Sequence, residues 1–206
     1  MINKNKLVEL LATFFYIGKI KYCPGTFGSL AAFPLYYIIV YFTMTNQIIF
    51  SFKNLNNMEQ QMLTIFTIVS AFNIALFIIG IYCSSLYIKN TGREDPKEVV
   101  IDEVVGQMLV VSSCVFSNLF IHYSNVTNYL DTKHINFIFL FILPFVLFRF
   151  FDIIKPWPIN WADRKIKGGL GVMLDDILAA IFAIVCQYAI TFIIIDWIGA
   201  NLIINI

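Results

Sequence analysis

Charge is scarce in this 206-residue chain, and neither sign dominates. Charged residues make up 13% of the sequence, with 14 Lys and Arg against 13 Asp and Glu, whereas soluble domains average about 25%. The near-neutral balance lacks the basic footprint of a nucleic-acid-binding protein. We therefore expect no nucleic-acid partner, and an electrostatic function must come from a local cluster of charges.

Cysteine and histidine are also scarce. The four cysteines lie far apart and form no C-x-x-C pair, which predicts neither a zinc site nor a disulfide framework. None of them opens the Cys-x5-Arg loop of a cysteine phosphatase, and the Asp-x-Asp and P-loop phosphate signatures are absent too. The two histidines, His122 and His134, flank a single loop.

Hydrophobic residues, in contrast, make up 59% of the chain, and the mean hydropathy is +0.79. Spanning the hydrocarbon core of a bilayer takes about 20 mostly apolar residues. Five segments qualify as candidates: Gly28–Met44, Met62–Ile88, Val104–His122, Ile135–Phe151 with Pro144 as an expected kink, and Ile177–Gly199. Ahead of them, Leu7–Ile17 is expected to form an interfacial or half-buried helix. The sequence thus predicts an all-α, multi-pass membrane helical bundle of about five spans, with residues 1–206 forming one domain.

Basic residues alternate along the chain in a way that predicts orientation. The segments before span one, between spans two and three, and between spans four and five hold four, three and five of them, whereas the other two loops hold only Lys53 and Lys133. By the positive-inside rule, the basic side faces the cytoplasm. Most acidic residues lie on the same side, which topology does not require, whereas both histidines lie on the other. The mixed cluster therefore indicates a functional site.

The first chemistry-bearing segment runs from Lys21 to Ser29 and leads into span one. A turn rich in Gly, Ser and Thr at a helix start presents unpaired backbone N–H groups and a positive dipole end, which suit an anion. Thr26 and Ser29 are the candidate anion-binding side chains. The alternative is an ordinary helix start in which one of them is the N-cap.

The second segment runs from Asp95 to Glu103. Asp95 as N-cap, Pro96 next and Glu98 two residues later predict a helix start. Asp102 and Glu103 would then lie two turns, about 10 Å, into the helix. Adjacent acids next to an apolar span are costly unless they are paired or bind a metal. This pair is therefore a candidate metal site.

The third and densest segment runs from Arg149 to Asp176. Arg149 and Asp152 are predicted i, i+3 partners at the end of span four, and prolines 156 and 158 end that helix. Three glycines allow the backbone to approach a ligand, and two adjacent acids are expected to open span five: Gly168, Gly169, Gly171, Asp175 and Asp176. The alternative is a connecting loop with capping acids and a basic rim that snorkels to the headgroups.

The three segments together point to metal-assisted phosphoryl chemistry. Carboxylate oxygens favour Mg²⁺ or Mn²⁺ with a phosphate completing the coordination, and Lys and Arg match phosphate oxygens. At the edge of the bilayer, the substrate would be a phospholipid or another membrane-anchored phosphate. With no histidine on the correct face, the nucleophile is either a metal-held water or an Asp, and the residues leave this choice open.

These segments closely resemble the phosphatidylglycerophosphatase A family, from about residue 10 to residue 195. The resemblance rests on Pro24–Ser29, on Asp95-Pro96 with Asp102–Gly106, and on Phe148–Ile159 followed by Asp163-Arg164 and Gly168–Asp176. It implies hydrolysis of phosphatidylglycerophosphate to phosphatidylglycerol with Mg²⁺ at the inner membrane. Membrane lipid is then the expected partner, and no obligatory protein partner is expected.

The resemblance also gives a hypothesis for the role of each residue. The metal, or its water, would be held by Asp102, Glu103, Asp175 and Asp176. Asp152 and Asp163 would act as a further ligand, general base or nucleophile. Phosphate oxygens would be neutralised by Arg149, Lys155, Arg164 and Lys167. The substrate would also contact Thr26, Ser29, Gly168, Gly169 and Gly171.

Two other functions compete with this one. A phosphotransferase acting on CDP-lipids also uses clustered Asp and Gly residues, but its motif opens with Asp-Gly and separates its last acids, whereas Arg164 follows Asp163 and the last two acids are adjacent here. A transporter would place ionisable groups inside the spans, where this sequence has almost none.

Overall fold

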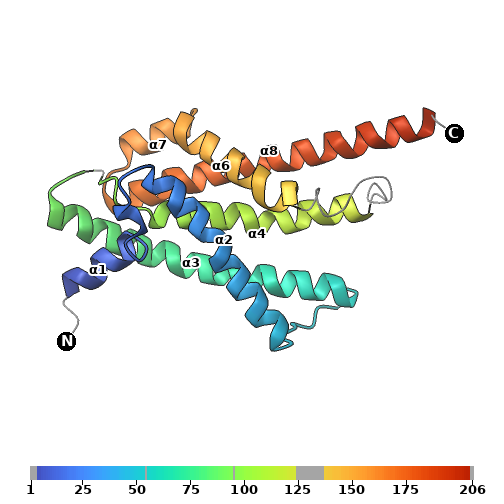
Figure 1. Ribbon diagram of the computed structural model, residues 1–206, viewed down its shortest axis with the longest axis horizontal. Coiled ribbons are helices and arrows are strands. Elements are labelled where there is room, and N and C mark those ends of the chain that lie inside the picture. Colours follow the sequence, from blue (N-terminus) through green and yellow to red (C-terminus); the bar gives the residue numbers. More distant parts are fainter. Residues whose placement is uncertain (1–3, 54, 95, 124–136, 205–206) are drawn as a thin grey trace.

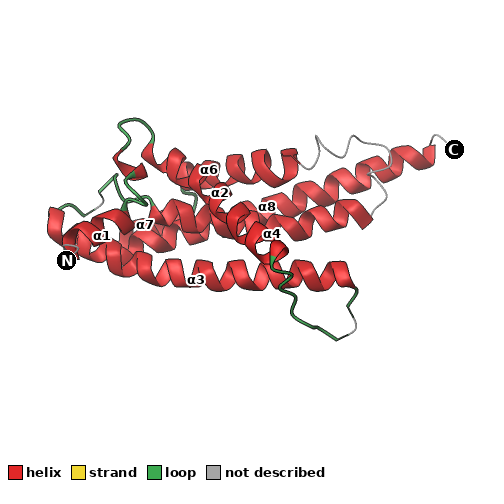
Figure 2. Ribbon diagram, turned by 60° about the horizontal axis from the view of Figure 1, so that its bottom comes forward, coloured by secondary structure: helices red, strands yellow, loops and turns green. Residues whose placement is uncertain are grey.

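The computed structural model is helical and describes residues 4–53, 55–94, 96–123 and 137–204 (Figures 1 and 2). The elements are α1 (Lys4–Ala12), the 3-10 turn η1 (Ile17–Lys19), α2 (Pro24–Thr45), α3 (Asn57–Thr91), α4 (Ile101–Tyr123), the π-helix η3 (Ile138–Ile142), α6 (Leu143–Ile154), α7 (Ile159–Lys165) and α8 (Gly168–Ile204). No strand occurs in these residues. The all-α prediction is therefore confirmed.

Three helices in the described part of the chain are long and apolar enough to cross a membrane: α2, α3 and the first 30 residues of α8. They contain the first, second and fifth predicted spans. The third predicted span matches α4, and the fourth begins outside the described residues and continues through η3 into α6. Five spans therefore stay a prediction, whereas a membrane-associated helical bundle agrees with the structure.

Helix α4 lies at the centre of the bundle and contacts α2, α3, α6 and α8. Small residues allow this close approach. A Cβ atom at Gly106 on α4 would lie 2.6 Å from the Phe148 ring of α6, which is fully buried. On α8, Ala179, Ala180 and Ala183 are completely buried in the same core. Small contact residues are typical of helix packing in membranes, and here they fix α4, α6 and α8 relative to one another.

Pro144 lies where the helical path changes, as predicted, but the distortion precedes it. The π-helix η3 ends at Ile142, and Pro144 is the second residue of α6. A π-helix displaces the regular hydrogen-bond ladder. The buried Gln187 of α8 donates a hydrogen bond from Nε2 to the Phe139 carbonyl over 3.0 Å. The side chain thereby ties α8 to the irregular turn.

Helix α1 is half buried, as expected, but ends at Ala12 rather than continuing to Ile17. Val8 and Ala12 face the bundle and α1 packs against α3. Beyond Ala12, three consecutive residues beginning at Phe14 have positive φ and reverse the chain. The Ala12 carbonyl then accepts a hydrogen bond from the Val100 N–H over 3.1 Å. The N-terminal segment thus positions the residues that lead into α4.

Two predicted helix starts are wrong. Helix α4 begins at Ile101 rather than at Pro96, so Asp102 and Glu103 occupy its first turn. The Val100 hydrogen bond to Ala12 holds the preceding residues outside the helix. Helix α8 begins at Gly168, which has a φ of 74°, so Gly169 and Gly171 are helical and Asp175 lies two turns inside the helix rather than at its start.

Candidate active site

Helices α2, α4 and α8 all begin at the end of the bundle where α6 finishes (Figure 1). A cavity of about 510 Å³ opens between them. All three chemistry-bearing segments reach it in the described part of the chain. The cavity is lined by thirteen of the predicted site residues: Thr26, Asp102, Glu103, Arg149, Asp152, Lys155, Asp163, Arg164, Lys167, Gly168, Gly171, Asp175 and Asp176.

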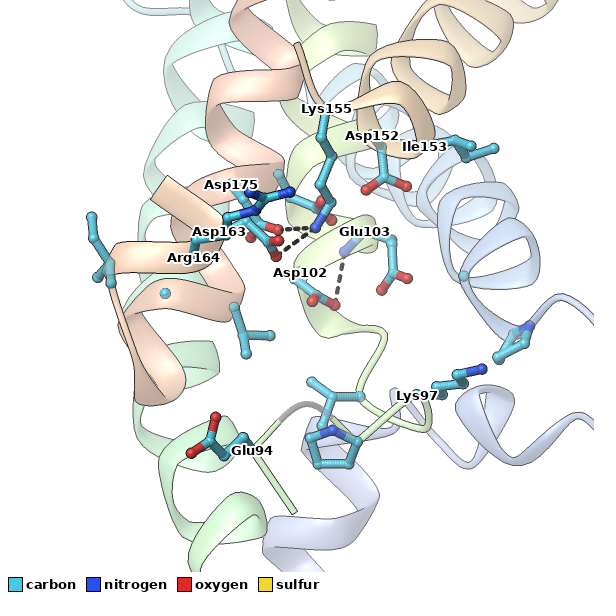
Figure 3. A pocket seen from close by; sticks show the side chains of 18 of the residues that line it. Glu94, Lys97, Asp102, Glu103, Asp152, Ile153, Lys155, Asp163, Arg164 and Asp175 are labelled. Atoms are coloured by element: carbon cyan, nitrogen blue, oxygen red, sulfur yellow. Dashed lines mark hydrogen bonds and ion pairs between the residues drawn. The ribbon is translucent and has the colours of Figure 1, made fainter. Parts of the chain in front are cut away.

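Three carboxylates form the inner part of the cavity. Asp102 and Glu103 from α4 and Asp176 from α8 each offer an oxygen within 4.8 Å of the others. The Glu103 backbone N–H donates to Asp102 Oδ1 over 3.1 Å, a contact drawn in Figure 3. Glu103 Oε2 and Asp176 Oδ2 are buried and have no hydrogen-bond partner in the described part of the chain. Like charges this close are stable only with a cation or with bound protons, and carboxylate oxygens are the ligands that Mg²⁺ prefers.

Lys155 links two of the remaining acids. Its ammonium lies 2.8 Å from Asp163 Oδ1 and 2.5 Å from Asp175 Oδ2, as the dashed lines in Figure 3 show. Burial lowers the pKa of Lys155, but the Asp175 and Asp163 carboxylates outweigh burial and raise that pKa overall. Lys155 therefore stays charged. Its ammonium forms an ion pair with Asp175, whereas the described structure shows no such pair between Lys155 and Asp102, Glu103 or Asp176.

Arg149 supplies the second cation on the same wall. Its Nη1 lies 2.6 Å from Asp152 Oδ2, which confirms the predicted i, i+3 pair. The same nitrogen donates to Ser29 Oγ over 3.4 Å. Ser29 is fully buried and does not line the cavity, and its hydroxyl donates to the Gly25 carbonyl over 3.0 Å. The N-cap of α2 is Cys23, without a side-chain hydrogen bond, so neither Thr26 nor Ser29 caps the helix.

The glycines differ in what they do. A Cβ at Gly25 would collide with Glu103 Oε1, so the start of α2 comes directly against this carboxylate. Gly171 lines the cavity. Gly169 does not: its N–H donates to Ser85 Oγ over 3.1 Å, and it faces α3. Gly169 therefore joins α8 to α3.

Sequence reasoning overlooked several lining residues. Glu94 and Lys97 reach the cavity from the segment before α4 (Figure 3). Glu94 pairs with Lys167 over 3.6 Å, and both side chains are largely exposed. In the sequence, Glu94 and Lys97 contribute only to the predicted topology and charge distribution. Their closeness to Asp102 along the chain also indicates a place near the site. Asp95, the predicted N-cap, lies outside the described residues.

Known proteins with similar sequences bear on the identity of this site. The model of the family described as phosphatidylglycerophosphatase A matches residues 10–191. The chain belongs to this family. The predicted resemblance is thereby confirmed over nearly the range expected from the motifs. No solved structure matches the chain.

Curated relatives agree with the family assignment. A phosphatidylglycerophosphatase A of Haemophilus influenzae is 32% identical over 90% of this chain and 89% of its own length. One from Escherichia coli is 29% identical over 85% of this chain and 78% of its own. The family member described here is therefore an enzyme, a phosphoric monoester hydrolase. A Bacteroides thetaiotaomicron protein named as a putative phosphatidylinositol-3-phosphatase is 28% identical over 87% of the chain and 90% of its own length.

Proposed function

We propose that this protein is a Mg²⁺-dependent phosphatase that hydrolyses phosphatidylglycerophosphate to phosphatidylglycerol and phosphate, with its site facing the cytoplasm from a bacterial inner membrane. The observation that carries the proposal is the convergence of Asp102 and Glu103, in the first turn of α4, with Asp176, about two turns into α8. In the proposed orientation, this end of the bundle meets the lipid headgroups. The names of the Haemophilus influenzae and Escherichia coli relatives supply the substrate.

Asp102, Glu103 and Asp176 would hold the ion, because their oxygens share one small volume and two of these oxygens have no other described partner. Bound there, Mg²⁺ would offset charge on the phosphate and lower the pKa of a coordinated water. The sequence predicts Asp175 as a metal ligand, but we assign it a different role. Its Oδ2 contacts Lys155, so it orients that lysine.

The positive groups of the cavity would bind the phosphate. Arg149 and Lys155 stand on the α6 side, and the cavity also receives the start of α2 at Thr26 and of α8 at Gly168. A helix start offers backbone N–H groups and a positive dipole end to an anion. These fixed charges stabilise the phosphoryl oxygens as negative charge develops on them during reaction.

Hydrolysis breaks the bond between phosphorus and the glycerol oxygen, water supplies the new oxygen on phosphorus, and the glycerol oxygen takes up a proton. Asp152 and Asp163 are the two candidates for the base or nucleophile. Asp152 is the more enclosed, with 13% of its side chain exposed against 41% for Asp163. Both are held by cations, Asp152 by Arg149 and Asp163 by Lys155.

The Bacteroides thetaiotaomicron relative suggests a second substrate for comparison. The test is phosphate release by the purified protein from phosphatidylglycerophosphate, phosphatidylinositol 3-phosphate and phosphatidic acid, each with Mg²⁺ or with EDTA. We expect fastest release from phosphatidylglycerophosphate and none with EDTA. Preference for the inositol lipid would replace the proposed substrate. Undiminished release in EDTA would contradict the metal requirement.

A further inference from the structure

A second cavity, of about 390 Å³, lies beside the first and is lined by Trp157, Asn160, Trp161, Arg164 and Lys165. Arg164 lines both cavities. The other four residues do not line the first cavity, and none has been given a role in phosphate hydrolysis. The two cavities therefore adjoin at this residue.

The second cavity has the composition of a headgroup site. Ile159 and Ala162 are fully buried and fix one face of α7 against the bundle, so that Trp161, Arg164 and Lys165 point outward. Trp157 is 80% exposed and Trp161 is 53% exposed. Exposed indoles favour the boundary between lipid chains and water, and Lys and Arg bind phosphate. A polar amide from Asn160 adds a hydrogen-bonding group.

The surface next to this cavity is apolar. Phe150, Ile153 and Ile154, in the last turn of α6, are all more than half exposed. They lead along α6 to Trp157. A lipid whose chains lay on these residues would hold its headgroup at α7. Its distal end would then face Arg164 and the first cavity.

We propose that the second cavity binds the phosphodiester of the same lipid whose terminal phosphate is hydrolysed in the first cavity. This inference rests on the proposed function. Phosphatidylglycerophosphate carries one phosphodiester and one phosphomonoester, joined by a single glycerol. Arg164 reaches both phosphates, while Lys165 pairs with the diester and Trp157 and Trp161 enclose the adjoining glycerol.

The substrate class follows from this arrangement. A preferred lipid has a phosphodiester next to its chains and a phosphomonoester farther out on the same headgroup. Phosphatidic acid has the monoester alone and leaves the second cavity empty. Phosphatidylglycerophosphate and phosphatidylinositol 3-phosphate, the lipids after which the Haemophilus influenzae and Bacteroides thetaiotaomicron relatives are named, both carry the two groups.

The test compares kcat/KM for phosphatidylglycerophosphate and phosphatidic acid in one detergent. Lys165→Ala and Trp161→Ala should each lower kcat/KM for phosphatidylglycerophosphate about tenfold, the range expected for one hydrogen bond to a charged group. Both should leave kcat/KM for phosphatidic acid unchanged. Trp161→Phe should retain most of the preference. Lys89→Ala is the matched control, since Lys89 is exposed on α3 and lines neither cavity.

Equal losses on both lipids, or no loss on either, would overturn the diester assignment while leaving the proposed function standing. A wild-type protein that releases phosphate from neither lipid would instead overturn the proposed function. Binding gives an independent measurement in EDTA. In a Trp197→Phe background Trp157 and Trp161 are the only tryptophans, and micelles containing phosphatidylglycerol, which keeps the diester, should shift their emission. Lys165→Ala should weaken that response about tenfold, and an unchanged response would contradict the inference.

Discussion

The role of the buried Asp176 follows from the residues around it. It is 3% exposed, and its Oδ2 has no described hydrogen-bond partner. An isolated carboxylate at this depth would be strongly unfavourable. Asp102 and Glu103 add further negative charge instead of relieving it. The arrangement is stable only with a cation or with bound protons, which is why we expect these residues to govern metal binding.

Asp176→Asn tests that role. The amide removes one anionic ligand but keeps the side-chain shape, so turnover should fall at least about 100-fold, as for loss of one key electrostatic group. Without metal the variant should unfold at the same temperature as the wild type or a higher one, because one like-charged neighbour is gone. Phosphate release and thermal unfolding in detergent measure the two effects. Hydrolysis within twofold of wild type would remove Asp176 from the site.

Gly25→Ala tests the contact between α2 and Glu103. The added methyl group would collide with Glu103 Oε1 and displace the carboxylate. A displacement of about 1 Å in an active site can cost about 100-fold in rate, and we expect a loss of roughly 10- to 100-fold in kcat/KM with the fold intact. Glu103→Asp in the same chain provides a matched check, since the shorter acid leaves room for the methyl group. Full activity in Gly25→Ala alone would show that Glu103 has space to move without consequence.

At the scale of the element, the helix starts explain what the sequence predicted well and what it did not. The residues of the site were recognisable because acids beside apolar runs are costly unless they bind a cation or a ligand. How far these residues lie from the start of each helix was not predictable from the sequence. Asp95, Pro96 and Glu98 match a helix-start pattern, yet a hydrogen bond from Val100 to Ala12, more than eighty residues earlier in the chain, overrides it.

The same limit applies to Gly168–Gly171. Three glycines in four residues predict a loop, whereas they form the first turn of α8 because Gly169 fits closely against Ser85 and Ile81 of α3. A tertiary contact has overridden a weak local preference. Residue identity therefore indicated which residues gather at the cavity, and only contacts with partner helices fixed where the helices begin.

The residue that ends α6 has a strained backbone conformation at the site. Lys155 is the C-cap of α6 with φ of 46° and ψ of 61°, in the left-handed region that glycine adopts most easily. Its side chain contacts Asp163 and Asp175, so the conformation persists with a lysine. Strain of this kind often accompanies functional positions.

Lys155→Gly and Lys155→Ala separate the backbone from the charge. Both remove the ammonium and should abolish most activity. The glycine variant should be more stable than the alanine variant by about 1 kcal/mol, because only alanine retains the left-handed strain. Thermal unfolding of the two purified proteins gives this difference. Equal stabilities would mean that residue 155 changes conformation once its side chain is lost.

At the scale of the whole molecule, the starts of three long helices meet in one cavity. The positive ends of α2, α4 and α8 all face the carboxylates and the phosphate they would receive. Ion binding should therefore stabilise the entire bundle, since Asp102 and Glu103 belong to α4 and Asp176 to α8. At a Mg²⁺ concentration about 100-fold above its Kd, the free energy of unfolding should rise by about 2.7 kcal/mol.

Thermal unfolding with increasing Mg²⁺ measures this stabilisation, with Asp176→Asn as the variant expected to lose it. K⁺ at equal ionic strength controls for general ionic effects, because a monovalent ion binds a carboxylate cluster far more weakly. A rise in unfolding temperature that is equal in wild type and Asp176→Asn would place the ion elsewhere on the protein.

Helix α8 is 37 residues long, and Asp176 lies eight residues, about 12 Å, from its start. Asp175 and Asp176 therefore lie at a fixed depth along α8, which continues beyond them as a long apolar helix. On the proposed function, a lipid would reach the acids by sideways diffusion within its leaflet and would not be withdrawn into water. The reaction velocity then depends on the mole fraction of substrate at the micelle surface. Adding inert detergent to mixed micelles should therefore slow turnover even when the total amount of lipid is constant.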